Sequence, residues 1–372
     1  MHCPHHEANR CRSCSELPVP YPDQLAAKQA HARRLLGEAQ WLEPAASRES
    51  GFRNRAKMAV GGSAGQPLLG ILDAHGHGVD LADCALYPPA LQASFAPLKA
   101  FIARAAIEPY DLSTRRGELK YVLVTLAEHS GELMVRFVLR SQEPLARLRK
   151  HLGSLCEALP ALRVISVNLQ PEHKAVLEGE HEILLTAEAT LAMRVNGLTL
   201  HLRPQGFFQT HTAMAAELYA QTAAWVRELQ PASVWDLYCG VGGFALHCAD
   251  GTRAVLGVEA SAEAIAAAER SRIEAGLTQV RFLAEDAAVF ATRQPQAPEL
   301  VIVNPPRRGI DETLCRWLDA STVRWLVYSS CNAESLARDL ARMPGLRLQR
   351  ARVLDLFPHT RHYEVLTLLG RG

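Results

Sequence analysis

A cysteine near the C-terminal end of the chain stands where it could act as a nucleophile. Cys331 lies in the segment Tyr328-Ser329-Ser330-Cys331-Asn332, directly after the apolar run Trp325-Leu326-Val327. Two other loops, residues 236–244 and 304–309, also follow short apolar runs. We expect all three loops to leave the carboxyl ends of parallel strands, which is where open α/β sheets bind ligands. Cys331 is therefore a candidate catalytic residue.

The first of these loops has the composition of a cofactor-binding turn. Gly240-Val241-Gly242-Gly243 lies at a predicted strand-to-helix turn, where glycine lets the backbone approach a ligand closely. Glu259 ends the next strand, nineteen residues after Gly240, and could accept hydrogen bonds from two ribose hydroxyls. Because residues 240–245 also fit G-x-G-x-x-A, this loop alone is consistent with NAD(P) and with S-adenosylmethionine. Asp286, after the third strand, is either an adenine contact or a helix cap.

The second loop favours methyl transfer. Asn304-Pro305-Pro306 is similar to the loop with which many class I methyltransferases face the group to be methylated. Amino-group methyltransferases usually have an aromatic residue next, whereas this chain has Arg307, so a different acceptor is indicated.

A cysteine that adds to C6 of uracil makes C5 nucleophilic enough to take a methyl group. A base must then remove the C5 proton, and Glu364, between the last two predicted strands, is the candidate.

The composition indicates a soluble globular protein. The 372 residues are 48% hydrophobic and 21% charged, and no run of 18 apolar residues suggests a membrane span. The polar N-terminus lacks the apolar core of a secretory signal, so a cytoplasmic location is expected. The net charge of +1 gives no general argument for nucleic acid. Residues 28–57, with seven Lys and Arg against three Glu, are compatible with phosphate contacts.

Three cysteines at the N-terminus suggest a metal centre. Cys3, Cys11 and Cys14 lie within a segment that is rich in Pro, Ser and Arg and cannot build a core, so a metal is an economical source of order. The nearest later cysteine, Cys84, would supply a fourth thiolate. Four thiolates suit zinc or an iron–sulfur cluster, and the loose C-x7-C spacing favours the cluster. The alternative is a disordered tail with incidental cysteines.

The predicted elements divide the chain into two regions. Short alternating strands between about residues 50 and 190 predict an α+β domain. From about residue 210, strands and helices alternate, which predicts a doubly wound, largely parallel sheet. Residues 346–356 and 363–369 predict a C-terminal antiparallel hairpin. The expected domains are residues 1–195, with the cluster cysteines in 1–84, and residues 196–372.

Several segments together resemble the RNA uracil-C5 methyltransferase family. They occur in the family's order across the C-terminal half: Phe208-Gln209-Thr210, residues 236–244, 304–309, Ser330-Cys331-Asn332 and 357–364. With the N-terminal cysteines, the chain is similar to the iron–sulfur-containing members that modify 23S rRNA. The cysteines begin at residue 3, with no small β-barrel RNA-binding domain before them, which points to the shorter 23S rRNA type.

The resemblance implies a class I (Rossmann-like) methyltransferase domain that uses S-adenosylmethionine to methylate C5 of an unpaired 23S rRNA uridine, or of a different rRNA or tRNA uridine. A monomer without an obligate protein partner is expected. The resemblance implies that Cys331 is the nucleophile and that Glu364 is the base. It implies Gln209, Tyr238, Glu259 and Asn304 as cofactor contacts, to which the glycine turn and the loop after the third strand add Gly240 and Asp286. The implied ligands of a structural [4Fe-4S] cluster, which would order an N-terminal α+β domain for RNA binding, are Cys3, Cys11, Cys14 and Cys84.

One position departs from the family's pattern. Many relatives have aspartate where this chain has Asn304, although an amide can still accept from uracil N3–H and donate to O4. Three other functions remain open from the residues alone. An amino-group methyltransferase would need no cysteine, an NAD-dependent oxidoreductase would use Glu259 for the ribose, and a non-catalytic RNA-binding iron–sulfur protein would leave the three strand-end loops without a purpose.

Overall fold

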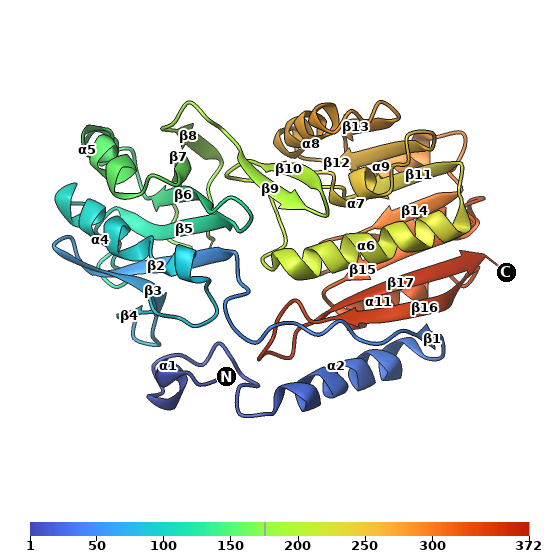
Figure 1. Cartoon of the computed structure of the whole chain (residues 1–372), viewed down its shortest axis with the longest axis horizontal. Coiled ribbons are helices and arrows are strands. Elements are labelled where there is room, and N and C mark those ends of the chain that lie inside the picture. Colours follow the sequence, from blue (N-terminus) through green and yellow to red (C-terminus); the bar gives the residue numbers. More distant parts are fainter. Residues whose placement is uncertain (175, 372) are drawn as a thin grey trace. The chain divides into compact units, whose positions relative to one another are not determined.

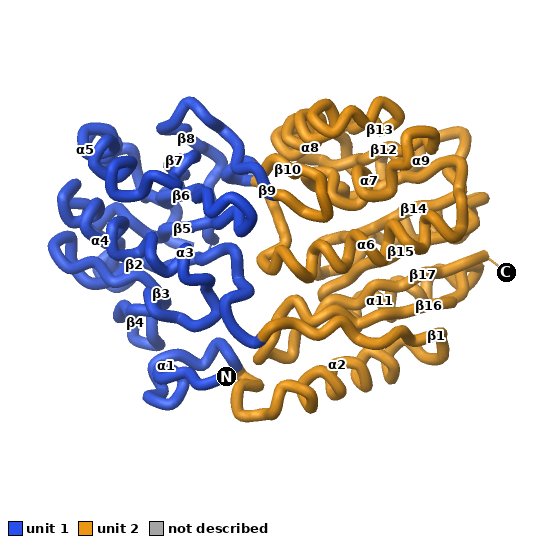
Figure 2. Tube along the Cα trace, in the orientation of Figure 1, with its two compact units in different colours: residues 1–14, 49–193, 203–205 blue, residues 15–48, 194–202, 206–372 orange. Residues whose placement is uncertain are grey.

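The structure, a computed structural model, describes residues 1–174 and 176–371. The chain divides into two compact units (Figure 2). Unit 1 comprises residues 1–14, 49–193 and 203–205, and unit 2 comprises residues 15–48, 194–202 and 206–372. Each unit has its own main sheet. Within the described residues, no helix combines the length and apolar character that crossing a membrane requires.

Unit 1 is an α+β structure, as expected. Its seven-stranded sheet has the order β4-β3-β2-β5-β6-β7-β8, and only β6 and β7 pair in parallel. The alternating pattern of β2 buries Ala56, Met58 and Val60 in a core with residues of α4 and α5. The strands are β2 (Arg55–Ser63), β3 (Gln66–Leu72), β4 (Gly78–Asp80), β5 (Leu119–Ala127), β6 (Glu132–Leu139), β7 (Leu162–Leu169) and β8 (His181–Leu184). The helices are α1 (Pro4–Glu7), α3 (Pro89–Gln92), α4 (Phe95–Arg104) and α5 (Leu145–Ala158).

Unit 2 contains the predicted doubly wound sheet, with the strand order β1-β16-β17-β15-β14-β11-β12-β13 (Figure 1). The five strands from β15 to β13 in this order pair in parallel, and β14 and β15 are apolar and buried, as parallel strands covered on both faces should be. They are β11 (Ser233–Leu237), β12 (Ala254–Glu259), β13 (Val280–Ala284), β14 (Leu300–Val303) and β15 (Trp325–Ser330). The helices are α2 (Tyr21–Leu36), α6 (Thr212–Leu229), α7 (Gly243–His247), α8 (Ala262–Glu274), α9 (Ala287–Arg293), α10 (Glu312–Ala320) and α11 (Ala333–Leu340). A separate hairpin is formed by β9 (Leu191–Val195) and β10 (Leu198–Leu202).

The predicted C-terminal hairpin is present and extends the parallel sheet. Its strands are β16 (Leu346–Leu354) and β17 (Glu364–Arg371), which pair antiparallel. The last strand, β17, lies between β16 and β15 and is antiparallel to both. This insertion brings the segment before β17 to the carboxyl end of β15.

One part of the predicted domain division is corrected by the structure. Residues 15–48 were placed in the N-terminal region 1–195 but belong to unit 2. The short strand β1 (Gln40–Trp41) pairs in parallel with β16, and α2 is joined to the C-terminal segment by an ion pair between Lys28 and Asp355. Both side chains are almost fully buried, at 4% and 0% exposed. No local pattern could reveal this, because the partners are more than 300 residues apart in the sequence.

Candidate active site and cysteine group

The candidate nucleophile and base come together through the pairing of β15 with β17. Ser330, the last residue of β15, pairs with Val365 in this antiparallel ladder. Cys331, directly after β15, and Glu364, the first residue of β17, therefore occupy the next facing positions of the ladder. They are also close enough for the negative charge of Glu364 to raise the pKa of Cys331. The structure thus joins two residues that the sequence analysis had selected separately.

Glu364 is a buried carboxyl group with a pKa near neutrality. Its side chain is only 2% exposed, and burial raises its pKa from 4.5 to about 7. Ser329 donates a hydrogen bond from Oγ to Oε1 of Glu364, which counteracts part of this rise. A carboxyl group with this pKa can accept and release a proton at neutral pH. Sequence reasoning missed Ser329, because a serine within a buried strand carries no local signal of its partner.

Cys331 is half-buried, and two nearby charges shift the pKa of its thiol in opposite directions. Burial and the nearby Glu364 carboxylate raise the pKa of its thiol, whereas the Arg307 guanidinium lowers it. Arg307 extends from the loop after β14, and its Nη2 lies 3.3 Å from Nδ1 of His362. The thiolate is therefore stabilised by a cation on one side and opposed by ionised Glu364 on the other.

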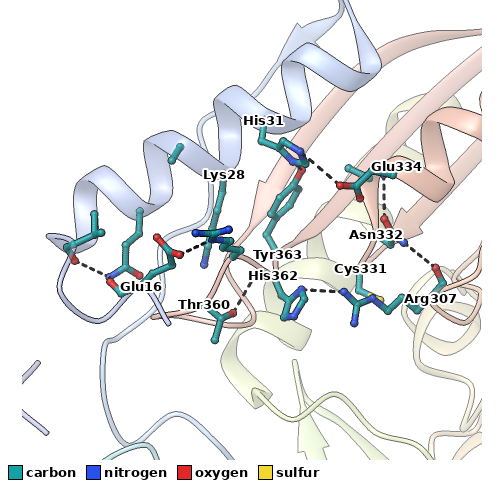
Figure 3. Close-up of a pocket in the computed structure, with 15 residues that line it drawn as sticks. Glu16, Lys28, His31, Arg307, Cys331, Asn332, Glu334, Thr360, His362 and Tyr363 are labelled. Carbon is teal, nitrogen blue, oxygen red and sulfur yellow. Dashed lines mark hydrogen bonds and ion pairs between the residues drawn. The ribbon is translucent and has the colours of Figure 1, made fainter. Parts of the chain in front are cut away.

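A cavity of about 470 Å³ opens beside Cys331 within unit 2 (Figure 3). Figure 3 shows Cys331 and Arg307 at one side of it, and Lys28 of α2 at another. Among the residues selected from the sequence as catalytic or cofactor-binding, Cys331 alone lines this cavity. The predicted cofactor loops therefore do not form its wall.

The predicted cofactor loop has the geometry of a tight turn between β11 and α7. Tyr238, Gly240 and Gly242 have positive φ angles of 67°, 53° and 83°, a conformation that glycine adopts without strain. The next strand, β12, lies parallel to β11 and ends at Glu259, whose Oε2 accepts a hydrogen bond from the Gly240 backbone N–H at 3.3 Å. The structure thus brings Tyr238, Gly240 and Glu259 to one strand end.

A buried aspartate that the sequence analysis passed over fixes this turn. Asp236 is fully buried, and its Oδ2 accepts a hydrogen bond from the backbone N–H of Ala245 at 2.9 Å. Burial raises the pKa of Asp236 to about 8. The side chain therefore joins the end of β11 to the first turn of α7, which holds the intervening glycines in place. Its position inside the glycine-rich segment 236–244 was the available signal.

The remaining predicted cofactor residues have simpler surroundings. Asp286 caps α9, because its Oδ1 accepts hydrogen bonds from the backbone N–H groups of Ala288 and Val289, both at 3.0 Å. Of the two readings of Asp286 from the sequence, the helix cap is thus present, and an adenine contact stays a prediction. Asn304 is half-buried directly after β14, and Gln209 is buried shortly before α6.

The four predicted metal-ligating cysteines all lie in unit 1 and are half-buried. Burial, together with the charges of Cys84, Cys11 and Cys3, raises the pKa of Cys14 to about 12. The buried His5 forms a 2.6 Å contact between Nε2 and Oδ1 of Asp83, the residue before Cys84. Within residues 1–174 and 176–371, no group of three or more His, Cys, Asp or Glu side chains has the arrangement of a metal-ion site.

Comparisons with known proteins agree with this geometry. The family model described as tRNA (Uracil-5-)-methyltransferase matches residues 180–372. Proteins named 23S rRNA (uracil(747)-C(5))-methyltransferase RlmC, from Escherichia coli O139:H28 and from Shigella boydii serotype 4, are each 51% identical over 372 residues, which is 99% of this chain and 99% of theirs.

A solved structure confirms the predicted α/β methyltransferase fold. The Pyrococcus abyssi tRNA (uracil-54, C5)-methyltransferase, in complex with S-adenosyl-L-homocysteine, superimposes with a TM-score of 0.79 at 24% identity. The match covers 96% of this chain and 85% of that chain. The family model spans the half of the chain that contains the paired Cys331 and Glu364, and the curated relatives span nearly all of it. The chain therefore belongs to the RNA uracil-C5 methyltransferase family.

Proposed function

We propose that the protein methylates C5 of one unpaired uridine of 23S rRNA, the counterpart of uridine 747 in the names of its relatives. S-adenosylmethionine is the methyl donor. The observation that carries the proposal is the facing position of Cys331 and Glu364 at the end of the β15–β17 ladder, beside a cavity large enough for a nucleotide. The target base must leave any stack to reach the thiolate, so a loop nucleotide is the expected substrate.

The reaction begins at Cys331. Its thiolate adds to C6 of uracil, and the electron pair of the C5–C6 double bond moves to form an enolate. C5 then attacks the methyl carbon of the sulfonium, and S-adenosylhomocysteine leaves. The Glu364 carboxylate removes the proton from C5, which restores the enolate. Collapse of the enolate expels the Cys331 thiolate, re-forms the double bond and releases 5-methyluridine.

The side chains around this pair have defined parts in the reaction. Arg307 favours the thiolate form of Cys331 electrostatically. Ser329 orients Glu364 and favours its carboxylate form. Asn304, at the end of β14, accepts from N3–H and donates to O4 of the uracil. The residues that would hold the methyl donor are Gly240 and Glu259, the latter through the ribose hydroxyls, together with Gln209, Tyr238 and Asp286.

The four N-terminal cysteines hold a [4Fe-4S] cluster in this proposal. The support for this proposal is the chemistry of the residues: four half-buried thiols, three of them on a core-poor segment that would gain order from a bound group. Cys3, Cys11 and Cys14 would be joined to Cys84 through such a cluster, which would order the N-terminal segment of unit 1 for RNA binding. Methyl transfer to an enolate involves no net electron transfer, which supports a structural role.

The decisive test uses a 23S rRNA fragment with 5-fluorouridine at the target position. Fluorine at C5 cannot leave as a proton does, so the methylated adduct cannot be resolved and a covalent protein–RNA complex accumulates. We expect this complex with the wild-type protein and with Cys156→Ser, an exposed cysteine outside the site, but not with Cys331→Ser. A complex that survives in Cys331→Ser, or methylation by Cys331→Ala, would overturn the mechanism. The same label in tRNA tests the alternative substrate.

A further inference from the structure

The cavity beside Cys331 is larger than one reacting base requires. Its volume of about 470 Å³ is in the range of pockets that enclose whole drug-sized ligands. It extends from Cys331 to α2, and none of the proposed donor-binding residues lines it. The part of the cavity on the α2 side is therefore assigned neither to the uracil that meets Cys331 nor to the methyl donor.

The α2 wall of the cavity is firmly held in place. Gln24, Ala27, Lys28 and His31 of α2 line the cavity, and their spacing places them on one helix face. Lys28 is in the buried ion pair with Asp355 at 2.7 Å and also donates a hydrogen bond to the Phe357 carbonyl at 3.1 Å. Lys28 is thus occupied with structural contacts, and α2 presents a fixed surface to the cavity.

Two imidazole rings in this part of the cavity are braced by other aromatic rings. His31 Nδ1 lies 2.8 Å from the Tyr363 hydroxyl, and the two rings meet edge-on with centroids 6.0 Å apart. His362 meets Phe357 edge-on at 6.4 Å. Burial and the charge of Arg307 lower the pKa of His362, which disfavours the charged form of this ring. Braced, flat rings of this kind are the surfaces on which proteins stack unpaired RNA bases.

A cation lies close to Cys331 and to one of these rings, that of His362. Arg307 is close enough to Cys331 to lower its pKa, and its Nη2 is 3.3 Å from His362 (Figure 3). Among the residues that the structure describes, no carboxylate forms an ion pair with this exposed guanidinium. Two neighbouring nucleotides are joined by one phosphodiester. A phosphate on Arg307 would place one base over Cys331 and the other toward α2.

We propose that the α2 side of this cavity binds the nucleobase of a nucleotide directly adjacent to the target uridine. Its ring stacks on His31 or His362, and the phosphate between the two nucleotides lies on Arg307. The inference rests on the proposed function, since it requires a uridine at Cys331. It assigns to α2 part of the selection of the RNA site, through a base that does not react.

The test fills the α2 side of the cavity without deleting any contact. Ala27 lines the cavity and Ala26 does not, although both are exposed on α2. Ala27→Trp therefore obstructs the proposed site, and Ala26→Trp is the matched control. Both are assayed with 5-fluorouridine RNA that is intact, or that has an abasic ribose immediately 5′ or 3′ of the target. Binding of S-adenosylmethionine verifies that each variant is folded.

We expect Ala27→Trp to slow adduct formation on intact RNA at least tenfold, and Ala26→Trp to match the wild type. One of the two abasic RNAs should slow the wild type to a similar degree, and Ala27→Trp should then cause no further loss. Equal rates for the two tryptophan variants, or equal losses by Ala27→Trp on intact and abasic RNA, would overturn the adjacent-base site. Absence of any adduct with the wild type would instead count against the proposed function. His31→Ala, which removes one ring without adding bulk, should show the same dependence on the neighbouring base.

Discussion

The hydroxyl of Ser329 on β15 donates a hydrogen bond to the carboxyl group of Glu364 on β17. Because Glu364 is otherwise enclosed, its pKa rises to about 7, and the hydrogen bond from Ser329 opposes that rise. The proposed base is therefore kept partly ionised at neutral pH by a residue on the neighbouring strand. Ser329 acts through Glu364 and is a positioning residue, one step removed from the reacting atoms.

Replacing Ser329 by alanine should raise the pH at which the enzyme becomes active. A hydrogen bond to a charged group contributes about 1.5–3 kcal/mol, so its loss should raise the pKa of Glu364 by about one unit or more. Because only the carboxylate accepts the C5 proton, kcat should rise with pH through about 7 in the wild type and later in Ser329→Ala. Thr367→Val, which removes the buried hydroxyl that binds the Tyr328 carbonyl between the same strands, should leave the midpoint of the pH profile unchanged.

Glu364→Gln should be more stable than the wild type above neutral pH. The folded-state pKa of about 7 exceeds the ordinary value of 4.5, so the folded protein binds the proton more tightly than the unfolded chain. The wild type therefore loses stability, on the order of 3 kcal/mol, as pH rises from about 4.5 through about 7. Urea unfolding at pH 5 and pH 8 measures this change. An equal stability difference between the two proteins at both pH values would contradict the buried, high-pKa carboxyl.

Removing one partner of the Lys28–Asp355 ion pair should destabilise unit 2. Lys28→Met would leave Asp355, which is fully buried, without its partner, and should lower the free energy of unfolding by about 3–5 kcal/mol. The double variant Lys28→Met/Asp355→Leu removes both charges and should recover most of that loss. Denaturant titrations of the wild type, Lys28→Met and the double variant measure the free energies of unfolding. A double variant as unstable as Lys28→Met would show that the unpaired charge of Asp355 does not cause the loss of stability.

The proposed cluster predicts different consequences for two classes of cysteine. Cys14→Ser or Cys84→Ser should lower the iron and acid-labile sulfide content of the purified protein, together with its visible absorbance. Cys156→Ser, at an exposed position outside the group of four, should retain all three. Zinc in place of iron and sulfide would support the other metal that suits four thiolates. Full iron content in Cys84→Ser would remove that residue from the ligand set.

Loss of the Glu259 carboxylate should weaken binding of the methyl donor. Glu259 accepts hydrogen bonds from the backbone N–H groups of Gly240 and Ser261, at 3.3 and 3.0 Å, and so lies at the turn where the ribose is expected. We expect Glu259→Ala to raise the Kd for S-adenosylmethionine at least tenfold in a calorimetric titration. Glu263→Ala, on the exposed first turn of α8, is the matched control. Tight binding of NADH by the wild type would instead favour the oxidoreductase alternative.

The amino-acid sequence was sufficient to predict the type of sheet and the candidate residues at one of its edges. Alternating strands and helices after residue 210 predicted the parallel sheet of unit 2, because short apolar runs separated by helices leave few other arrangements. Glycines and a carboxylate at the expected spacing located the turn at Gly240 and Glu259, which the structure joins by a hydrogen bond. Cys331 was a candidate because it follows a predicted strand, at the edge where parallel sheets bind ligands. These patterns lie within short stretches of sequence, so they can be recognised without knowledge of distant contacts.

Contacts between residues that are far apart in the sequence could be identified only from the three-dimensional structure. The insertion of β17 between β15 and β16 sets Glu364 opposite Cys331 and beside Ser329, and a hairpin pattern does not specify where its strands join a sheet. The docking of α2 beside the C-terminal segment depends on a buried ion pair between Lys28 and Asp355. Burial determines the pKa of Glu364, and burial follows from packing across the whole unit. Long-range contacts of this kind leave no periodic trace in either segment, so the sequence indicated the candidate residues and the fold determined which of them lie together.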